Sequence, residues 1–197
     1  MQACCLRGDP MTHVQADAGV DLCLVLVESY AVNEQMNQIV LEHLDPAAWR
    51  AKLHGSKGRT IVAIFTHVHN MRRKWLRLSA PHLKLPAALD RASCTQKQAQ
   101  AALLESAARC SEMLADALSV SRSGPQSRVE VFLRDGWAKP WPAGAAMLAY
   151  MISHDAHHRG QVCMLAHQLG FPLPTKAASG IWVWEKLWKE CGFTHPR

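Results

Sequence analysis

Three histidines fall within five positions of the chain, in the segment Ser153-His154-Asp155-Ala156-His157-His158-Arg159-Gly160-Gln161. The surrounding residues have the periodicity of a helix, and His154 and His158 lie four residues apart in it. At about 3.6 residues per turn, these two side chains project from one face, one above the other. Imidazole nitrogen is a ligand for zinc, nickel, copper or iron, so the pair predicts a metal site if the chain supplies a third ligand.

A second pair of histidines, His67 and His69, lies in another segment with helical periodicity. Because they are two residues apart, they point in different directions and cannot both face one site. His67 has mostly apolar helical neighbours, whereas His69 has Arg72 and Arg73 near it, and these positive charges oppose a bound cation. The residues favour His67 without excluding His69, since both lie at the edge of the apolar arc.

Three histidines from two helices would leave a position open for water or substrate, which is typical of catalytic metal sites. Each ligating imidazole usually donates its second N–H to an acceptor, and Asp155, Gln161 or a backbone carbonyl could serve. His157 and Asp155 are the candidates for a general base. Gly160 suggests that another backbone or a ligand comes close to the helix. The alternative is that the histidines are hydrogen-bonded core residues, because an unpartnered buried polar group costs about 1–3 kcal/mol.

The elements that must position these residues follow from hydrophobic periodicity and capping signals. We expect helices over residues 21–44, 45–50, 61–78, 95–118, 145–169 and 181–191. Residues 119–144 break the helical period, and 129–133 could be a short strand or an extended cover over the core. The chain of 197 residues is therefore predicted to be all-α, with one four-helix bundle domain over 20–193 and a loose N-terminal segment over 1–19.

Several side chains are assigned to the surface or to the core by this reading. Glu34 and Gln38 lie away from the apolar side of the first helix. The run Arg72-Arg73-Lys74 is expected near the end of the second helix, where cations suit the helix dipole. The tryptophans of the last helix are expected to pack in the core: Trp182, Trp184 and Trp188.

Composition narrows the class of protein and its compartment. Lys and Arg exceed Asp and Glu by 22 to 16, and this moderate excess is spread along the chain, which gives weak support for nucleic-acid binding. Seven scattered cysteines without a CxxC pair predict neither a disulfide framework nor a cysteine-type zinc site. The apolar stretch over residues 20–27 is too short to span a bilayer and lacks the pattern of a signal peptide. We expect a soluble, cytoplasmic protein with no membrane partner.

Two segments carry a resemblance to a known family. Residues 151–161 look like the H-x-x-H-H-R-G-Q segment of the DinB/YfiT-like family, and residues 65–76 resemble its second helix. In that helix a histidine precedes a Trp-Leu pair by eight residues, and counting back from Trp75 leads to His67. The closing residues 181–193 resemble the end of a bacterial subgroup, so that the resemblance covers roughly 30–193.

The resemblance implies a four-helix bundle with up-up-down-down order, often assembled as a homodimer. It also implies a divalent metal ion, such as Zn, Ni, Mn or Fe, held by His67, His154 and His158. The wider superfamily includes thiol-dependent S-transferases and isomerases. We therefore expect a metal-dependent enzyme that activates a low-molecular-weight thiol or water for reaction with a small-molecule substrate, with thiol transfer preferred to hydrolysis. The alternatives are a non-catalytic metal-binding or stress-response module and, least favoured, a nucleic-acid-binding protein.

Overall fold

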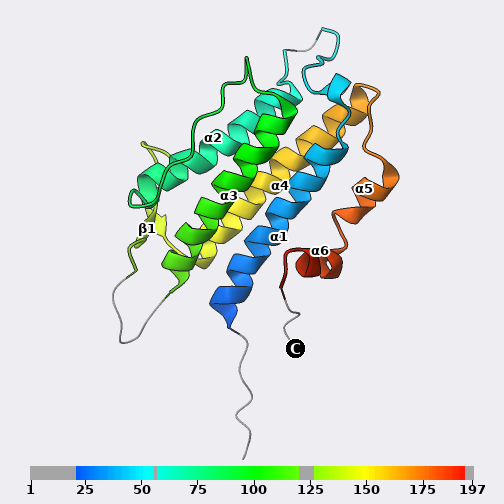
Figure 1. Cartoon of the computed structure of the whole chain (residues 1–197). Coiled ribbons are helices and arrows are strands. Elements are labelled where there is room, and N and C mark those ends of the chain that lie inside the picture. Colours follow the sequence, from blue (N-terminus) through cyan, green and yellow to red (C-terminus); the bar gives the residue numbers. More distant parts are fainter. Residues whose placement is uncertain (1–20, 56, 120–126, 194–197) are drawn as a thin grey trace, which may run out of the picture.

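The computed structural model describes residues 21–55, 57–119 and 127–193. The segment over 1–19, expected to be loose, lies outside these ranges. In chain order the described elements are α1 (Leu22–His43), the 3₁₀ helix η1 (Pro46–Ala48), α2 (Ile61–Ser79), α3 (Gln96–Leu118), β1 (Val131–Phe132), β2 (Trp141–Pro142), α4 (Ala145–Gln168), α5 (Thr175–Gly180) and α6 (Trp184–Glu190) (Figure 1). No helix in this part of the chain is long and apolar enough to cross a membrane.

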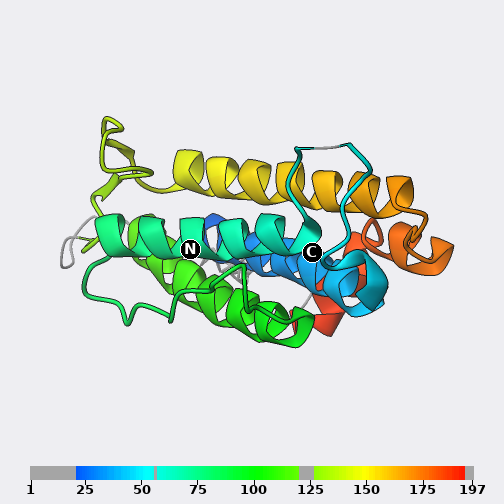
Figure 2. The same cartoon turned by 90° about the horizontal axis from the view of Figure 1, so that it is seen from above.

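Helices α1, α2, α3 and α4 lie side by side as a bundle (Figures 1 and 2). Helix α1 packs against α3 and α4, and α2 does the same, so α1 and α2 occupy opposite corners. One face of α3 is buried along the whole length of the helix, as expected for a helix that packs between two neighbours. The all-α four-helix bundle expected from the periodicity is confirmed.

The order of helix directions differs from the expected up-up-down-down order. In Figure 1, α1 runs upward, α2 and α3 run downward, and α4 runs upward. The connection between α1 and α2 is held by a hydrogen bond of 3.1 Å from the Val62 N–H to the Trp49 carbonyl, which turns α2 back at that end of the bundle. The connection over residues 80–95 then returns along the bundle, so α3 starts at the same end as α2.

Short polar side chains set the starts of these elements. The Asp45 carboxylate accepts a hydrogen bond of 2.8 Å from the Ala47 N–H, which starts η1 at Pro46 as the sequence predicts. Thr60 caps α2 by accepting from the Ala63 N–H at 3.4 Å. The helix that carries His67 therefore has a start fixed by its own sequence.

The segment after α3 forms a small hairpin that covers the lower end of the bundle in Figure 1. Strands β1 and β2 pair antiparallel, with Phe132 opposite Trp141. Phe132 is fully buried, and its ring centroid lies 6.0 Å from that of Trp75 on α2. The short strand that was one of two expectations for residues 129–133 is therefore present, over two residues.

Two expectations about the bundle surface are wrong. Glu34 and Gln38 are buried because they face the inside of the bundle, where Glu34 meets Arg72 of α2 and the Gln38 amide donates to Glu34 and to the Gln100 carbonyl of α3. Arg72 is completely buried in the interior of α2, where it meets carboxylates of α1 and α4 instead of the helix C-terminus. The other two residues of the basic run are held by intramolecular contacts: Arg73 to the Pro86 carbonyl and Lys74 to Asp135.

The last helix, predicted over residues 181–191, is α6 over Trp184–Glu190, and a short helix that was not predicted, α5, precedes it. The chain turns after Gly180, where the Trp182 and Val183 N–H groups bond to the carbonyls of Ser179 and Gly180. As a result α6 presents only Leu187 and Trp188 to the bundle. Trp182 and Trp184 are 72% and 39% exposed, so they are not core residues as predicted.

Candidate metal centre

Three histidine side chains converge between two antiparallel helices: His67 from α2, and His154 and His158 from α4. Their potential ligand nitrogens all lie within 4.8 Å of one another. The ring centroids of His154 and His158 are 4.5 Å apart, and those of His67 and His158 are 4.8 Å apart. The structure thus brings together the three residues selected from the sequence. Three imidazoles so placed could hold a divalent ion, and its binding stays a prediction.

His69 does not belong to this cluster. Its ring is fully buried, with Nδ1 3.0 Å from the Ala102 carbonyl oxygen and Nε2 2.8 Å from the Ala87 carbonyl oxygen. Burial lowers the pKa of this imidazole. Both ring nitrogens therefore face backbone carbonyls of α3 and of the connection before it, the neutral ring donates to one of the two, and His67 alone represents α2 at the site.

A glutamine one turn along α4 orients one of the three rings. The Oε1 atom of Gln161 lies 2.8 Å from Nδ1 of His158, and because an amide oxygen can only accept, this nitrogen is the donor. The lone pair of His158 Nε2 is then available to an ion. The amide nitrogen of Gln161 lies 3.0 Å from Nε2 of the exposed His157, which completes a chain of three side chains.

A carboxylate lies behind the second ring. Nδ1 of His154 and Oδ1 of Asp155 are both buried, and neither has a hydrogen-bond partner. The two atoms lie 3.7 Å apart. This carboxylate is the acceptor toward which an N–H on Nδ1 would point if Nε2 bound an ion. The donor set therefore fits a metal ion that prefers imidazole nitrogen: three rings, two of which have an acceptor at or near the second nitrogen.

The electrostatic surroundings keep the site neutral. The pKa of His67 is lowered from 6.5 to about 4, first by partial burial, then by the nearby His158, which would repel a second proton, and by the charge of Arg59. Burial also lowers the pKa of His158, with His154 and His157 adding to the effect. Both imidazoles are therefore unprotonated near neutral pH, which is the form that binds a metal ion.

A buried ion cluster supports the site from inside the bundle. Nη2 of Arg72 lies 2.6 Å from Oε2 of Glu34 and 2.5 Å from Oδ2 of Asp155, which also accepts from the Asn33 amide at 2.9 Å. Burial alone would raise the pKa of Asp155, but the charge of Arg72, together with the hydrogen bonding of Arg72 and the proximity of His154, lowers it. A carboxylate held in its charged form in this way is a weak base. Asp155 is placed to orient His154, which argues against the expectation that it acts as a general base.

Comparison with known proteins agrees with this geometry. The sequence profile of the DinB family matches residues 14–180, which include all three histidines. The chain belongs to the DinB family. No curated protein and no solved structure matches it. The match begins at residue 14, earlier than the resemblance, which began near residue 30. It ends at residue 180 and so does not include residues 181–193, which resemble the end of a bacterial subgroup.

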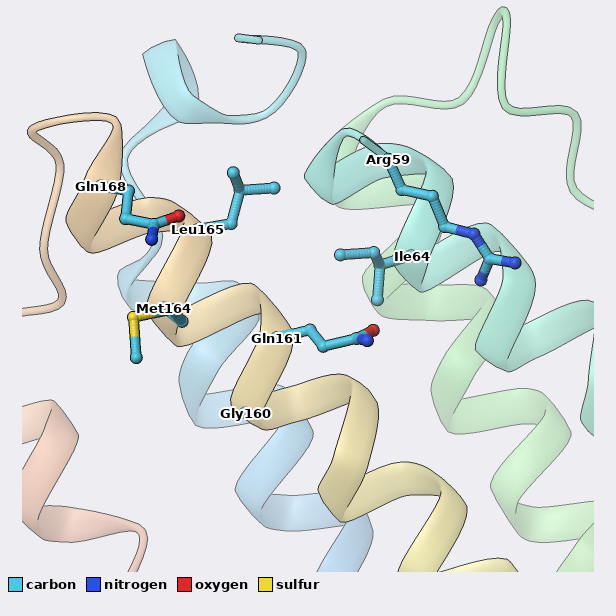
Figure 3. A pocket seen from close by; sticks show the side chains of 7 residues that line it. All are labelled: Arg59, Ile64, Gly160, Gln161, Met164, Leu165 and Gln168. Atoms are coloured by element: carbon cyan, nitrogen blue, oxygen red, sulfur yellow. The ribbon is translucent and has the colours of Figure 1, made fainter. Parts of the chain in front are cut away.

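In this DinB-family protein a cavity of about 450 Å³ lies between α2 and α4, and its wall includes Gln161, the residue that contacts His158 (Figure 3). Gln161 reaches from α4 toward α2, and Ile64 points back toward it from the start of α2, whereas the guanidinium of Arg59 extends over α2 on the side away from Gln161. Gly160 also borders the cavity, and a Cβ atom on it would meet no atom within 4 Å. The expectation that another backbone approaches Gly160 is therefore wrong, and the space beside it is open.

A second cavity, of about 350 Å³, lies on the other side of the same helix end and includes His67 and Arg59 in its wall. Arg59 thus belongs to both cavities that flank the histidine cluster. Sequence reasoning missed this residue. The sequence feature that could have identified it is its position: a cation directly before the N-cap Thr60 lies two helical turns from His67.

Proposed function

We propose that this DinB-family protein binds a divalent metal ion through His67, His154 and His158 and uses it as an enzyme to activate a small thiol or a water molecule. The observation that carries the proposal is the convergence of three imidazoles, one of which, His67, lies in the wall of a cavity. Three protein ligands leave a position for an exchangeable molecule. A divalent ion there would lower the pKa of water from ~15.7 toward ~7 and would deprotonate a thiol.

Transfer of a low-molecular-weight thiol is the preferred reaction, because the superfamily that includes the DinB family also contains thiol-dependent S-transferases and isomerases. In such a transfer, the thiolate sulfur attacks an electrophilic carbon, a carbon–sulfur bond forms, and a halide or similar group leaves with its electron pair. The thiol proton must pass to a base or to solvent. His157 is exposed, lies beside His158 and is joined to it through Gln161, so it is the nearest imidazole outside the ligand set.

Metal content is the direct test of the site. Protein purified without a histidine tag is analysed by elemental mass spectrometry, together with His154→Ala and the control His167→Ala. His167 lies on the same helix but is exposed and outside the cluster. We expect close to one equivalent of metal in the parent and the control, and its loss in His154→Ala. Parent protein that contains no metal and takes up none from Zn²⁺, Ni²⁺, Mn²⁺ or Fe²⁺ solutions would refute the proposal.

Activity separates the proposed reactions. Metal-loaded protein is incubated with a chlorinated aromatic electrophile in the presence and absence of cysteine or glutathione, and consumption of the electrophile is followed. Thiol-dependent consumption that His154→Ala abolishes supports thiol transfer, whereas hydrolysis of ester or amide substrates without thiol supports water activation. Metal uptake that raises the melting temperature, with no turnover on either panel, identifies a non-catalytic metal-binding module.

A further inference from the structure

The surface at the start of α2, about two turns before His67, is strongly cationic. A third cavity, of about 430 Å³, adjoins the other two at the start of α2, and five of its wall residues carry a positive charge: Arg50, Lys52, Lys57, Arg59 and Arg91. Arg59 is common to all three cavities, and Arg91 is shared by this one and the cavity that contains His67. A molecule that reaches the histidines from this side therefore passes these two guanidinium groups.

The acidic residue in these walls, Asp90, forms no ion pair with the arginines among the described residues. Asp90 borders the cavity of His67, but its carboxylate accepts hydrogen bonds from the Ala92 N–H at 3.0 Å and the Ser93 hydroxyl at 3.2 Å, within its own turn. Arg50 is fixed by donating to the carbonyls of Arg91 and Cys94. Its role is to hold the wall rather than to bind a ligand.

Arg59 is the cation best placed to act on a ligand. Among the described residues it forms no ion pair, whereas Arg72, Arg109 and Arg128 each have a carboxylate partner. It is exposed at the edge of the cavity, and Figure 3 shows its side chain beside Ile64 on the side of the cavity opposite Gln161. Its charge contributes to the lowered pKa of both His67 and His158, so its field extends to the histidine cluster.

We infer that the small molecule that reacts at the three-histidine site carries an anionic group such as a carboxylate, and that Arg59 binds this group with Arg91 beside it. The inference rests on the proposed function, since the anionic group is a handle for a molecule whose other end reaches the histidines. A planar guanidinium binds a carboxylate through two parallel hydrogen bonds, and such charge-assisted bonds are strong and directional. For thiol transfer, the thiol itself is then expected to be a carboxylate-bearing one.

Matched thiols test the inference by binding rather than by turnover. Co²⁺-loaded protein is titrated with 3-mercaptopropionate and 6-mercaptohexanoate, and with the neutral amide of each, while the thiolate-to-cobalt absorption is recorded. Two lengths are used so that one of them can span the distance from Arg59 to the histidines. At low ionic strength we expect at least one carboxylate to bind about 10-fold or more tightly than its amide. This preference should fall to about 2-fold or less in Arg59→Met and stay at the parent value in Arg77→Met, an exposed arginine at the other end of α2.

A second titration, with metal-free protein, separates failure of this inference from failure of the proposed function. Metal-free protein is titrated with succinate while the arginine Nε–H resonances are observed by NMR, and Arg59→Met assigns the Arg59 signal. A shift of that signal that saturates supports the anion site even if no cobalt is bound, in which case only the metal proposal has failed. Equal affinity for acid and amide at both lengths overturns the inference, as does a preference that survives in Arg59→Met/Arg91→Met.

Discussion

Replacement of Arg72 by methionine is expected to destabilise the bundle strongly. The Arg72 side chain is fully buried, and its two partners are nearly so, with side-chain exposures of 6% for Glu34 and 0% for Asp155. Methionine fills much of the same volume, so the main change is that two carboxylates lose their cation in a medium that hydrates them poorly. Removing one member of a buried ion pair costs about 3–5 kcal/mol. At about 2–4 °C per kcal/mol for a chain of this size, the melting temperature should fall by about 6–20 °C.

Urea and thermal unfolding of metal-free protein, followed by circular dichroism, measure this loss. Arg109→Met is the control, because Arg109 pairs with Glu112 at an exposed site, where the cost is expected to be below about 1 kcal/mol. The dependence on pH gives a second check. The folded pKa of Asp155 is lowered, so its share of the stability is present above the ordinary pKa of 3.8 and is lost as the pH falls through the folded value. A loss below about 1 kcal/mol at pH 7, or a gap between parent and variant that widens on acidification, would refute this reasoning.

Three further predictions concern the site. Gln161→Leu removes the acceptor that orients His158 and should weaken metal binding about 10- to 100-fold in a competition titration with a chelator. Gly160→Ala should stabilise the protein by about 0.5–1 kcal/mol in urea unfolding, because a helical glycine is replaced where a Cβ meets no atom within 4 Å; a loss of stability would mean that the position is crowded. The pKa of His67 is about 4 when folded and 6.5 ordinarily, so protons favour the unfolded chain between these values. Metal-free protein should therefore lose stability as pH falls from 6.5 to 4, and a smaller loss in His67→Gln would attribute part of it to this residue.

The part of the site that the sequence predicts is the part set by local geometry. His154 and His158 are brought together by helical spacing alone, since residues four apart share a face wherever the helix lies in the fold. Assigning His67 to the site requires knowing how α2 packs on α4. Periodicity alone could only favour His67 over His69. The resemblance to the family supplied the pairing of His67 with the two histidines of α4. The structure gives the physical reason why His69 is not the ligand, since its ring is buried against two carbonyl groups.

Polar contacts between residues far apart in the chain could not be predicted from the sequence. Arg72 was assigned to a helix end because it opens a basic run, yet it is four residues from Val68 and four from Leu76, both of which are buried. That spacing was a usable sign of burial. Its partners are 38 and 83 residues away along the chain, and no local pattern links Glu34 or Asp155 to an arginine. Hydrophobic periodicity treats a charge as a surface residue, so it fails where ions pair in the core.

The ion cluster and the histidine cluster are built on the same two helices, and this has a consequence for metal binding. Arg72 follows His67 on α2 and Asp155 follows His154 on α4, so the ion pair between Arg72 and Asp155 fixes the two helices against each other beside the site. The separation of the ligands is therefore set by contacts that involve no metal ion. A small zinc finger needs its ion to fold because it lacks such contacts. In this bundle the histidines are held together beforehand, and the ion is expected to affect reactivity far more than the fold.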